Sequence, residues 1–529
     1  MVIAKYGTVS CLWLPFVMVT LCCMFEKGEV FGQTTADKPN IVFILADDYG
    51  YNDIGYHAIK HNSSMKTPFL DSLALAGVKL ENYYVQPICT PSRSQLMSGK
   101  YQIHTGLQHL VITPPQPNGL GLDNIILPQQ LKHCGYSTYM VGKWHLGFYK
   151  TEYLPWNRGF DYYYGYLTGG EDYYTKYRCF GKLCGYDMTS LKGPTNETYG
   201  EYSAHLFARK TEEVIKAHDK THPMFLYVAL QSVHSPMEVP ESYAKPFSWI
   251  KNKNRRIHGG MILAMDEAVK NITNSLKSAG MWDNTLLIFS TDNGGQVFAG
   301  GNNWPLRGNK VTLWEGGIRG VGFVHGSMLK VPNPNTKPNT ALIHISDWLP
   351  TILSAAKCPL ISGSQQLDGF DQWDTIQKYT PSKRSEILHN IDPLNRVPIP
   401  DPHSMFVRKG FNTLIKAAIR MGDWKLITGN PGFEKWVEPP ELKNEISDEV
   451  LTTDYENDKN LPSKTVHLFN IAKDPYERNE LSQQHPDIVD ILLTRLAAYN
   501  QTAVPVRYPA EDPRCDPKLH GGFWQPWEN

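Results

Sequence analysis

The chain of 529 residues has no excess of charge of either sign, because 52 Lys and Arg residues balance 52 Asp and Glu residues. Bulk charge therefore gives it no affinity for nucleic acid or for an anionic membrane surface. Internal repeats and low-complexity tracts are absent too, which excludes repeat proteins. Its hydrophobic content of 41% is that of a globular chain, long enough for more than one domain. Any preference for anions must come from a local site.

Long apolar runs are missing beyond the N-terminus. Lys5 precedes an apolar run over 11–25, and Val30-Phe31-Gly32 offers a small-residue cleavage site, so residues 1–32 are predicted to be a secretory signal peptide. The run is short for a membrane span and contains Pro15; a retained anchor is the alternative reading. No stable membrane span is expected elsewhere, and the protein is expected to be lysosomal or secreted. Four sequons are then candidate glycan acceptors: Asn62, Asn196, Asn271 and Asn500.

Cysteine is scarce, with nine in the whole chain, three of them in the predicted signal peptide. Cys179 and Cys184 flank a glycine-containing loop and are predicted to pair locally. The pairing of Cys134, Cys358 and Cys515 stays open. A fold of this size with so few cysteines does not rest on a disulfide framework.

What the chain does have is a series of short apolar runs that end abruptly in polar residues. These runs are 41–46, 137–142, 224–230 and 285–290, and continuous apolar runs of this length suit strands buried on both faces of a largely parallel sheet. Helical spacing lies between them, for example at Ile262, Met265 and Val269. The sequence therefore predicts an α/β domain over 33–380, with helices on both sheet faces. Beyond about residue 380, short runs predict a smaller α+β domain over 381–529 with an antiparallel sheet.

Two of the strand ends carry only hard oxygen ligands. Asp47 and Asp48 follow the first run, and Asp292 and Asn293 follow the fourth. Ligand sites in such sheets gather at the carboxyl ends of strands, and this donor set suits Ca²⁺ or Mg²⁺ better than zinc. Taken one at a time, each pair is also what a helix cap or a turn contains.

Cys89 opens the segment Cys-Thr-Pro-Ser-Arg. Pro91 suits the first turn of a helix, so Cys89 is predicted to lie at a helix N-terminus, where unpaired N–H groups favour an anion. Arg93 lies one turn along on nearly the same face. By itself the segment also fits a buried thiol beside a helix cap.

Taken together, these motifs resemble the sulfatase family in kind and in order. The order is Asp47-Asp48, the Cys89 segment, Gly142-Lys143-Trp144-His145, His234-Ser235-Pro236 and Asp292-Asn293-Gly294-Gly295. The following segments 301–310 and 313–320, with the ending 512–517, resemble the arylsulfatase B-like branch, that of N-acetylgalactosamine-4-sulfatase. The resemblance runs from about Pro39 to Trp527 and implies an alkaline-phosphatase-like fold: a large mixed, mostly parallel sheet flanked by helices, with the smaller C-terminal domain.

The resemblance also implies the chemistry. Cys89 would be oxidised to Cα-formylglycine by the formylglycine-generating enzyme, and its hydrate would be the nucleophile. Ca²⁺ would be held by Asp47, Asp48, Asp292, Asn293 and the modified Cys89. Further roles follow for five side chains: Arg93 to steady the hydrate, Lys143 and Lys310 to clamp sulfate oxygens, His145 to take a proton when sulfate is expelled, and His234 with Lys310 to protonate the leaving alcohol. The cations of such a site outweigh its three aspartates, so it would bind an anion in a neutral protein.

One segment departs from the arylsulfatase B pattern. Where relatives of that branch carry additional cysteines, this chain has Thr113-Pro114-Pro115-Gln116-Pro117, so Cys515 lacks its usual partner. The leading hypothesis is a hydrolase of a sulfated sugar such as N-acetylgalactosamine 4-sulfate. Small sulfate esters, such as aryl sulfates and glucosinolates, are the second, and a catalytically silent secreted glycan-binding protein is the third. A metallophosphatase would want a Ser or Thr nucleophile and zinc-type histidines instead.

Overall fold

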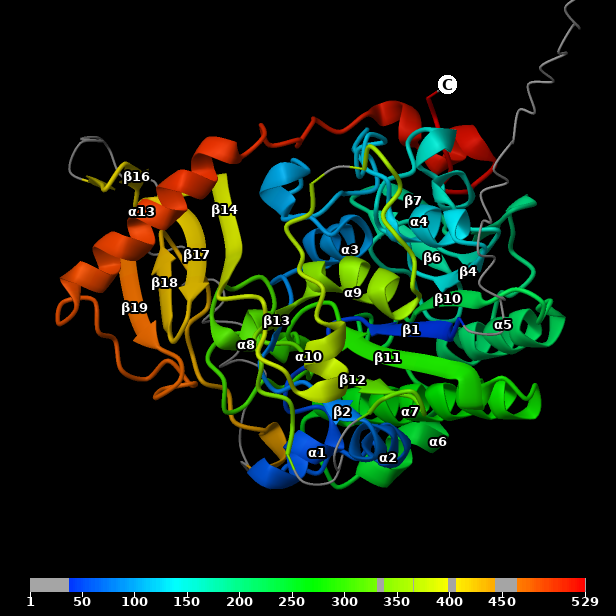
Figure 1. Ribbon diagram of the computed structural model, residues 1–529. Coiled ribbons are helices and arrows are strands. Elements are labelled where there is room, and N and C mark those ends of the chain that lie inside the picture. Colours follow the sequence, from blue (N-terminus) through cyan, green and yellow to red (C-terminus); the bar gives the residue numbers. More distant parts are fainter. Residues whose placement is uncertain (1–37, 331–336, 365, 398–405, 443–463, 529) are drawn as a thin grey trace, which may run out of the picture.

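The computed structural model describes residues 38–528 except 331–336, 365, 398–405 and 443–463. The predicted signal peptide lies outside the described residues. A nine-stranded sheet crosses the larger part of the molecule, with helices on both faces (Figure 1). Its order is β2-β12-β11-β1-β10-β4-β5-β8-β9. The strands are β1 (Asn40–Ala46), β2 (Val78–Lys79), β4 (Ser137–Gly142), β5 (Tyr162–Gly165), β8 (Thr189–Ser190), β9 (Gly193–Pro194), β10 (Met224–Ala229), β11 (Thr285–Thr291) and β12 (Gly322–His325).

The five central strands are parallel, and antiparallel strands complete both edges. This confirms the predicted mixed, mostly parallel sheet, and the four apolar runs named above form β1, β4, β10 and β11. Burial explains why they read as continuous apolar runs. Ile41, Phe43 and Leu45 pack on one side of the sheet, and Val42 and Ile44 pack on the other, since successive side chains of a strand point to opposite faces.

Helices cover the two faces separately. The face of Val42 and Ile44 packs against α2 (Pro68–Ala76), α5 (Ser203–Ala217) and α7 (Lys253–Ser278). The face of Ile41 and Phe43 packs against α3 (Cys89–Ser98), α4 (Leu127–His133) and α9 (Trp348–Ala355). Shorter helices are α1 (Gly55–Ala58), α6 (Glu241–Ala244), α8 (Glu315–Ile318) and α10 (Trp373–Lys378).

A separate antiparallel sheet follows, as predicted. It contains β14 (Glu386–Arg396), β17 (Ile415–Met421), β18 (Trp424–Thr428) and β19 (Val466–Asn470), and α13 (Pro486–Thr502) packs on it through Val489, Leu492, Leu493 and Leu496. Two small pairs are β3 (Tyr83–Tyr84) with β13 (Ile343–His344) and β15 (Val407–Arg408) with β16 (Phe411–Asn412).

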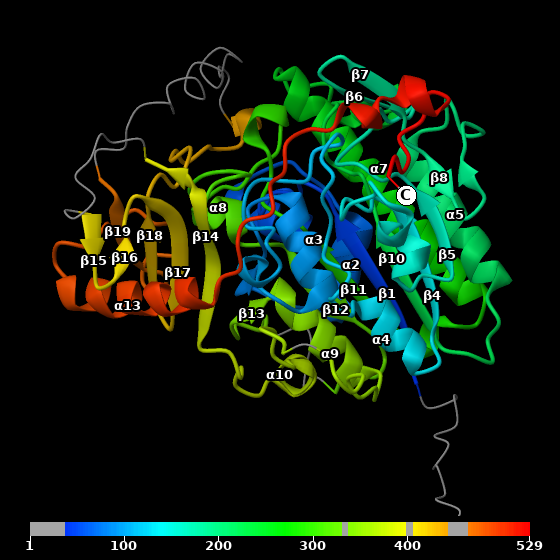
Figure 2. The ribbon, with the colours of Figure 1, turned by 90° about the horizontal axis from the view of Figure 1, so that it is seen from above.

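After α13 the chain returns to the larger part of the molecule (Figures 1 and 2). There it lies beside the hairpin of β6 (Tyr177–Phe180) and β7 (Leu183–Tyr186). A β-bridge between Tyr186 and Phe523 joins the two segments. Part of the predicted range 381–529 therefore packs on the larger sheet region rather than on the smaller one.

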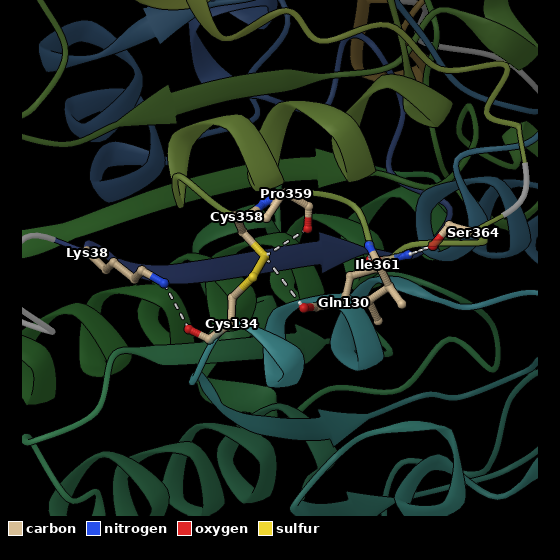
Figure 3. The surroundings of a disulfide bond; sticks show 7 residues. All are labelled: Lys38, Gln130, Cys134, Cys358, Pro359, Ile361 and Ser364. Atoms are coloured by element: carbon tan, nitrogen blue, oxygen red, sulfur yellow. Dashed lines mark hydrogen bonds between the residues drawn. A yellow bond between two sulfur atoms is a disulfide. The ribbon is translucent and has the colours of Figure 1, made fainter. Parts of the chain in front are cut away.

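Two disulfides are present among the described residues. Cys179 and Cys184 close the β6–β7 hairpin. Cys134, at the end of α4, bonds to Cys358, just after α9, and so ties together two helices of one face across 224 residues of sequence (Figure 3). Cys89 and Cys515 are buried and form no disulfide with another cysteine of the described part of the chain.

Candidate active site

Four neighbouring parallel strands deliver polar residues to one edge of the sheet. In the order β11-β1-β10-β4, their carboxyl ends lead to Asp292 with Asn293, Asp47 with Asp48, His234, and Lys143 with His145. Asp48 and His145 adopt left-handed backbone angles, with φ of 57° and 56°. Residues other than glycine rarely adopt this conformation, and it concentrates at functional sites.

Cys89 is the first residue of α3, as the sequence predicted. Its Sγ lies 3.6 Å from Asp47 Oδ1. Burial raises the pKa of the thiol to about 12, with Asp47 and Asp292 adding to the effect and Lys143 and Lys310 opposing it. A thiol nucleophile needs a lowered pKa. The raised pKa makes the unmodified thiol of Cys89 a poor nucleophile.

Arg93 lies one turn further along α3 and is fully buried. Its Nε and Nη2 donate to Asp292 Oδ2 at 3.1 and 2.8 Å, Nη2 lies 3.4 Å from Asp47 Oδ2, and Nη1 donates to the Lys143 carbonyl at 3.3 Å. Arg93 thus connects three strand ends and holds two aspartates beside Cys89.

Two lysines each contact one aspartate. Lys143 Nζ donates to Asp47 Oδ2 at 2.5 Å, and Lys310 Nζ donates to Asp48 Oδ2 at 2.7 Å. Burial opposes the charge of Lys310, but Asp48 and the other acidic groups outweigh it and raise the pKa of this ammonium. Lys310 therefore keeps its proton. Its loop is held by the Val311 N–H, which donates to the Pro87 carbonyl at 2.7 Å.

The two histidines are oriented by main-chain carbonyls. His145 Nε2 donates to the Ile112 carbonyl at 3.0 Å, and its Nδ1 is buried with no partner among the described residues. His234 Nδ1 donates to the Ser235 carbonyl at 2.6 Å, and its Nε2 lies 3.8 Å from Asp48 Oδ2. Burial lowers both pKa values, helped by Lys143 at His145 and by Lys310 at His234, whose pKa falls to about 4. Both rings are neutral at pH 7 and present one bare nitrogen.

The aspartates experience opposite environments. Burial alone would raise the pKa of Asp47 and Asp48, but nearby cations, chiefly Lys143 for Asp47 and Lys310 for Asp48, outweigh it and lower both. Burial and the charge of Asp47 raise the pKa of Asp292 to about 7. Carboxylates crowded in this way gain from a divalent cation.

The donor atoms fit such a cation. Ligand atoms of Asp47, Asp48, Cys89 and His234 lie within 4.8 Å of one another. Asn293 Nδ2 donates to Asp48 Oδ1 at 2.9 Å, which leaves Asn293 Oδ1 buried with no hydrogen-bond partner among the described residues. An orphaned amide oxygen next to carboxylates is a hard ligand set, so the residues present fit Ca²⁺ or Mg²⁺.

A cavity of about 150 Å³ opens above these groups, and it is lined by Cys89, His145, His234 and Lys310. Its outer wall comes from Val111–Pro114 and from Arg178 and Phe180 of the β6–β7 hairpin. The segment that departs from the arylsulfatase B pattern is thus part of the pocket wall. Sequence reasoning missed Arg178 and the glycines Gly169 and Gly170, because only the fold brings them to the strand ends.

The structure brings all the predicted catalytic and metal-binding residues to this one place. A model of the sulfatase family matches residues 39–358. This chain belongs to the sulfatase family. The sulfatase is 50% identical to arylsulfatase J of Mus musculus over 507 residues, which are 95% of this chain and 82% of the relative. It is 30% identical to arylsulfatase A of Homo sapiens over 359 residues, 64% of this chain and 68% of the relative.

The solved structure of Ps i-CgsB shares the fold, with a TM-score of 0.72 and 27% identity over 92% of this chain and 98% of that one. These comparisons show that the sulfatase is a hydrolase of sulfuric esters with an alkaline-phosphatase-like fold. Among the described residues, no helix is both long and apolar enough to cross a membrane. The four sequon asparagines are exposed.

Proposed function

We propose that this sulfatase hydrolyses the sulfate ester of a sugar, using formylglycine derived from Cys89 and a bound Ca²⁺. The observation that supports it best is the surroundings of Cys89: a buried residue at a helix N-terminus, in contact with Asp47 and beside the cavity that Lys310 also lines. The hydrate of formylglycine supplies an oxygen nucleophile and a second hydroxyl, which a cysteine or serine lacks.

The Ca²⁺ would be held by Asp47, Asp48, Asp292 and Asn293 with the modified residue 89, and it would supply positive charge beside the sulfate. The side chains do the rest. Lys310 lines the cavity, and Lys143 lies buried against Asp47. Both are assigned to binding sulfate oxygens. Arg93 steadies the hydrate indirectly as well, because it fixes Asp47 and Asp292.

Proton transfer is assigned to three groups. His145 has its Nε2 proton committed to Ile112, so its bare Nδ1 accepts a proton when sulfate is expelled. His234 and Lys310 lie on either side of Asp48, and together they protonate the leaving alcohol: the proton comes from the Lys310 ammonium, and the bare Nε2 of His234 can accept it and pass it to the leaving oxygen. Lys310 is the member of this pair that remains protonated at pH 7.

The substrate is proposed from the relatives and from the motifs. N-acetylgalactosamine-6-sulfatase of Homo sapiens is 30% identical over 302 residues, and a relative of the fold, at 26% identity, was solved with k-i-k-neocarrahexaose. These relatives favour a sulfated sugar, and the arylsulfatase B-like segments 301–310 and 313–320 favour a terminal N-acetylgalactosamine 4-sulfate. A small sulfate ester, aryl or glucosinolate, is the second candidate, because the departing segment at Thr113 and Pro114 lines the pocket.

The same proposal places the protein in the secretory pathway, lysosomal or secreted, where the formylglycine-generating enzyme would modify Cys89. Two disulfides and four exposed sequons support an oxidising compartment.

The test has two parts. Peptide mass spectrometry of secreted protein should find Cys89 as formylglycine in most molecules, and the protein should cleave a panel of N-acetylgalactosamine 4-sulfate, an aryl sulfate and a glucosinolate with a clear order of preference. Active protein that carries only a thiol at Cys89 would contradict the mechanism. Inactivity on every ester would favour the catalytically silent glycan-binding protein.

A further inference from the structure

Arg178 lines the pocket, and the proposed reaction assigns it no role. It lies on β6 two residues before Phe180, and both line the cavity that contains Cys89, His234 and Lys310. Residues two apart on a strand share one face, and the intervening Cys179 is exposed. The hairpin therefore presents Arg178 and Phe180 together to the substrate.

The position of Arg178 relative to the catalytic groups follows from Gly170. A methyl group built on Gly170 would lie 3.1 Å from His234 Cε1 and 3.9 Å from Arg178 Nη1. Both side chains thus flank the same glycine. Because His234 borders the leaving alcohol in the proposed function, Arg178, on the other side of Gly170, lies close to the alcohol part of the substrate.

The guanidinium has no carboxylate of its own. Lys143, Lys310 and Arg93 are each paired with an aspartate, whereas Arg178 makes no ion pair within 4.0 Å among the described residues, and its Nε is buried with no hydrogen-bond partner there. Asp187 responds to the charge of Arg178. Its oxygens, however, already accept from the N–H groups of Leu167 and Thr168, each at 2.9 Å.

The hairpin that carries Arg178 is rigidly held. The Cys179–Cys184 disulfide closes it, and the buried Trp524 donates its Nε1 proton to the Arg178 carbonyl at 2.9 Å. The C-terminal segment thereby fixes the backbone from which the guanidinium extends, which reduces the entropy lost on binding.

From this geometry we infer that Arg178 is a specificity-determining residue, which binds a second anionic group on the alcohol part of the sulfate ester. A planar guanidinium with free N–H donors binds a carboxylate or a sulfate through two hydrogen bonds. The preferred substrates are then saccharides that carry a uronic acid carboxylate or a second sulfate beside the ester that is cleaved. This inference rests on the proposed function and narrows its substrate class.

The test compares Arg178→Gln with the wild-type protein on four esters. Two of them have no second anion: an aryl sulfate and N-acetylgalactosamine 4-sulfate. The other two are N-acetylgalactosamine 4-sulfate linked to a uronic acid, and N-acetylgalactosamine 4,6-disulfate. The last two separate a carboxylate from a sulfate as the second anion. Lys182→Gln removes the same charge from an exposed position on the same hairpin and serves as the matched control, with thermal denaturation to confirm folding.

Wild-type protein should have the highest kcat/KM on the esters with a second anion. Arg178→Gln should lower that value about 10- to 100-fold, chiefly through KM, since a charge-assisted contact outside the reacting atoms is lost. Its effect on the aryl sulfate and the monosulfated sugar should stay within about 3-fold, and Lys182→Gln should change neither. Equal losses on all four esters, or no preference for a second anion in the wild type, would overturn the inference. A wild-type protein inactive on every ester would instead defeat the proposed function, and the inference with it.

Discussion

Glu477 should make the folded protein more stable to unfolding at pH 4.5 than at pH 8. It belongs to a fully buried cluster in which Lys425 Nζ bonds Glu477 Oε1 at 2.7 Å and Glu315 Oε1 at 2.9 Å. The Glu315 N–H also donates to Glu477 Oε2 at 2.7 Å. The cluster joins Lys425 of β18, in the smaller sheet, to Glu315, the first residue of α8. Glu315 lies five residues after Lys310 in the sequence. Two carboxylates therefore share the Lys425 side chain at the junction of the smaller sheet with the segment that follows Lys310.

Burial and the neighbouring charge of Glu315 raise the pKa of Glu477 from 4.5 to about 7, although Lys425 opposes the shift. The native state then binds a proton more tightly than the unfolded chain, so the stabilisation is fully present below pH 4.5 and is lost as pH rises through 7. At 1.36 kcal/mol for each pKa unit, the difference between the two ends is about 3 kcal/mol. Glu315, whose pKa is lowered chiefly by Lys425 against the effect of burial, acts only below that window.

The assay is urea unfolding between pH 4.5 and 8 on wild-type protein, on Glu477→Gln and on Glu434→Gln. Glu434 is an exposed carboxylate, paired with Arg307 at 2.9 Å, and it is the control. Glu477→Gln should flatten the pH dependence by about 3 kcal/mol whatever its effect on absolute stability, because glutamine does not titrate. A wild-type slope in Glu477→Gln, or a flattened one in Glu434→Gln, would refute the reasoning.

Four further predictions concern the active site. Rigorous chelation, or Asp292→Ala, should lower kcat by several orders of magnitude with circular dichroism unchanged, and full activity in metal-free protein would contradict the assigned ligands. His234→Ala should reduce turnover of sugar sulfates more than that of activated aryl sulfates, whose alcohols leave without protonation; equal losses would reassign the proton donor. His145→Ala should give a rapid burst of alcohol, equal to the enzyme concentration, and little turnover afterwards, which quenched-flow measurement detects; steady turnover without a burst would exclude a role in the second half of the reaction. Gly169→Ala should lower kcat at least 10-fold, because its Cβ would lie 2.9 Å from His145 Cε1; wild-type kinetics would show that the ring has room to move.

The sequence by itself determined which residues meet at the candidate active site, and it determined the central sheet. Strands buried on both faces must be apolar throughout, so β1, β4, β10 and β11 were predictable from their composition alone. Each such run ends at the carboxyl edge of the sheet, and the polar residues placed there, among them Asp47 and Lys143, were predicted to face one site. Pro91 likewise indicated the start of α3, and with it the position of Cys89.

Tertiary structure alone decided the neighbours of these groups. The short antiparallel strands at the sheet edges have no apolar period long enough to read, and they form because the central strands offer them free edges. The Cys134–Cys358 bond could not be predicted, since a pairing across 224 residues depends on how α4 and α9 pack. Arg178 carries no local signal either. It reaches the pocket because Trp524, 346 residues later in the chain, holds its hairpin against the strand ends, and contacts at such separation are a property of the folded molecule.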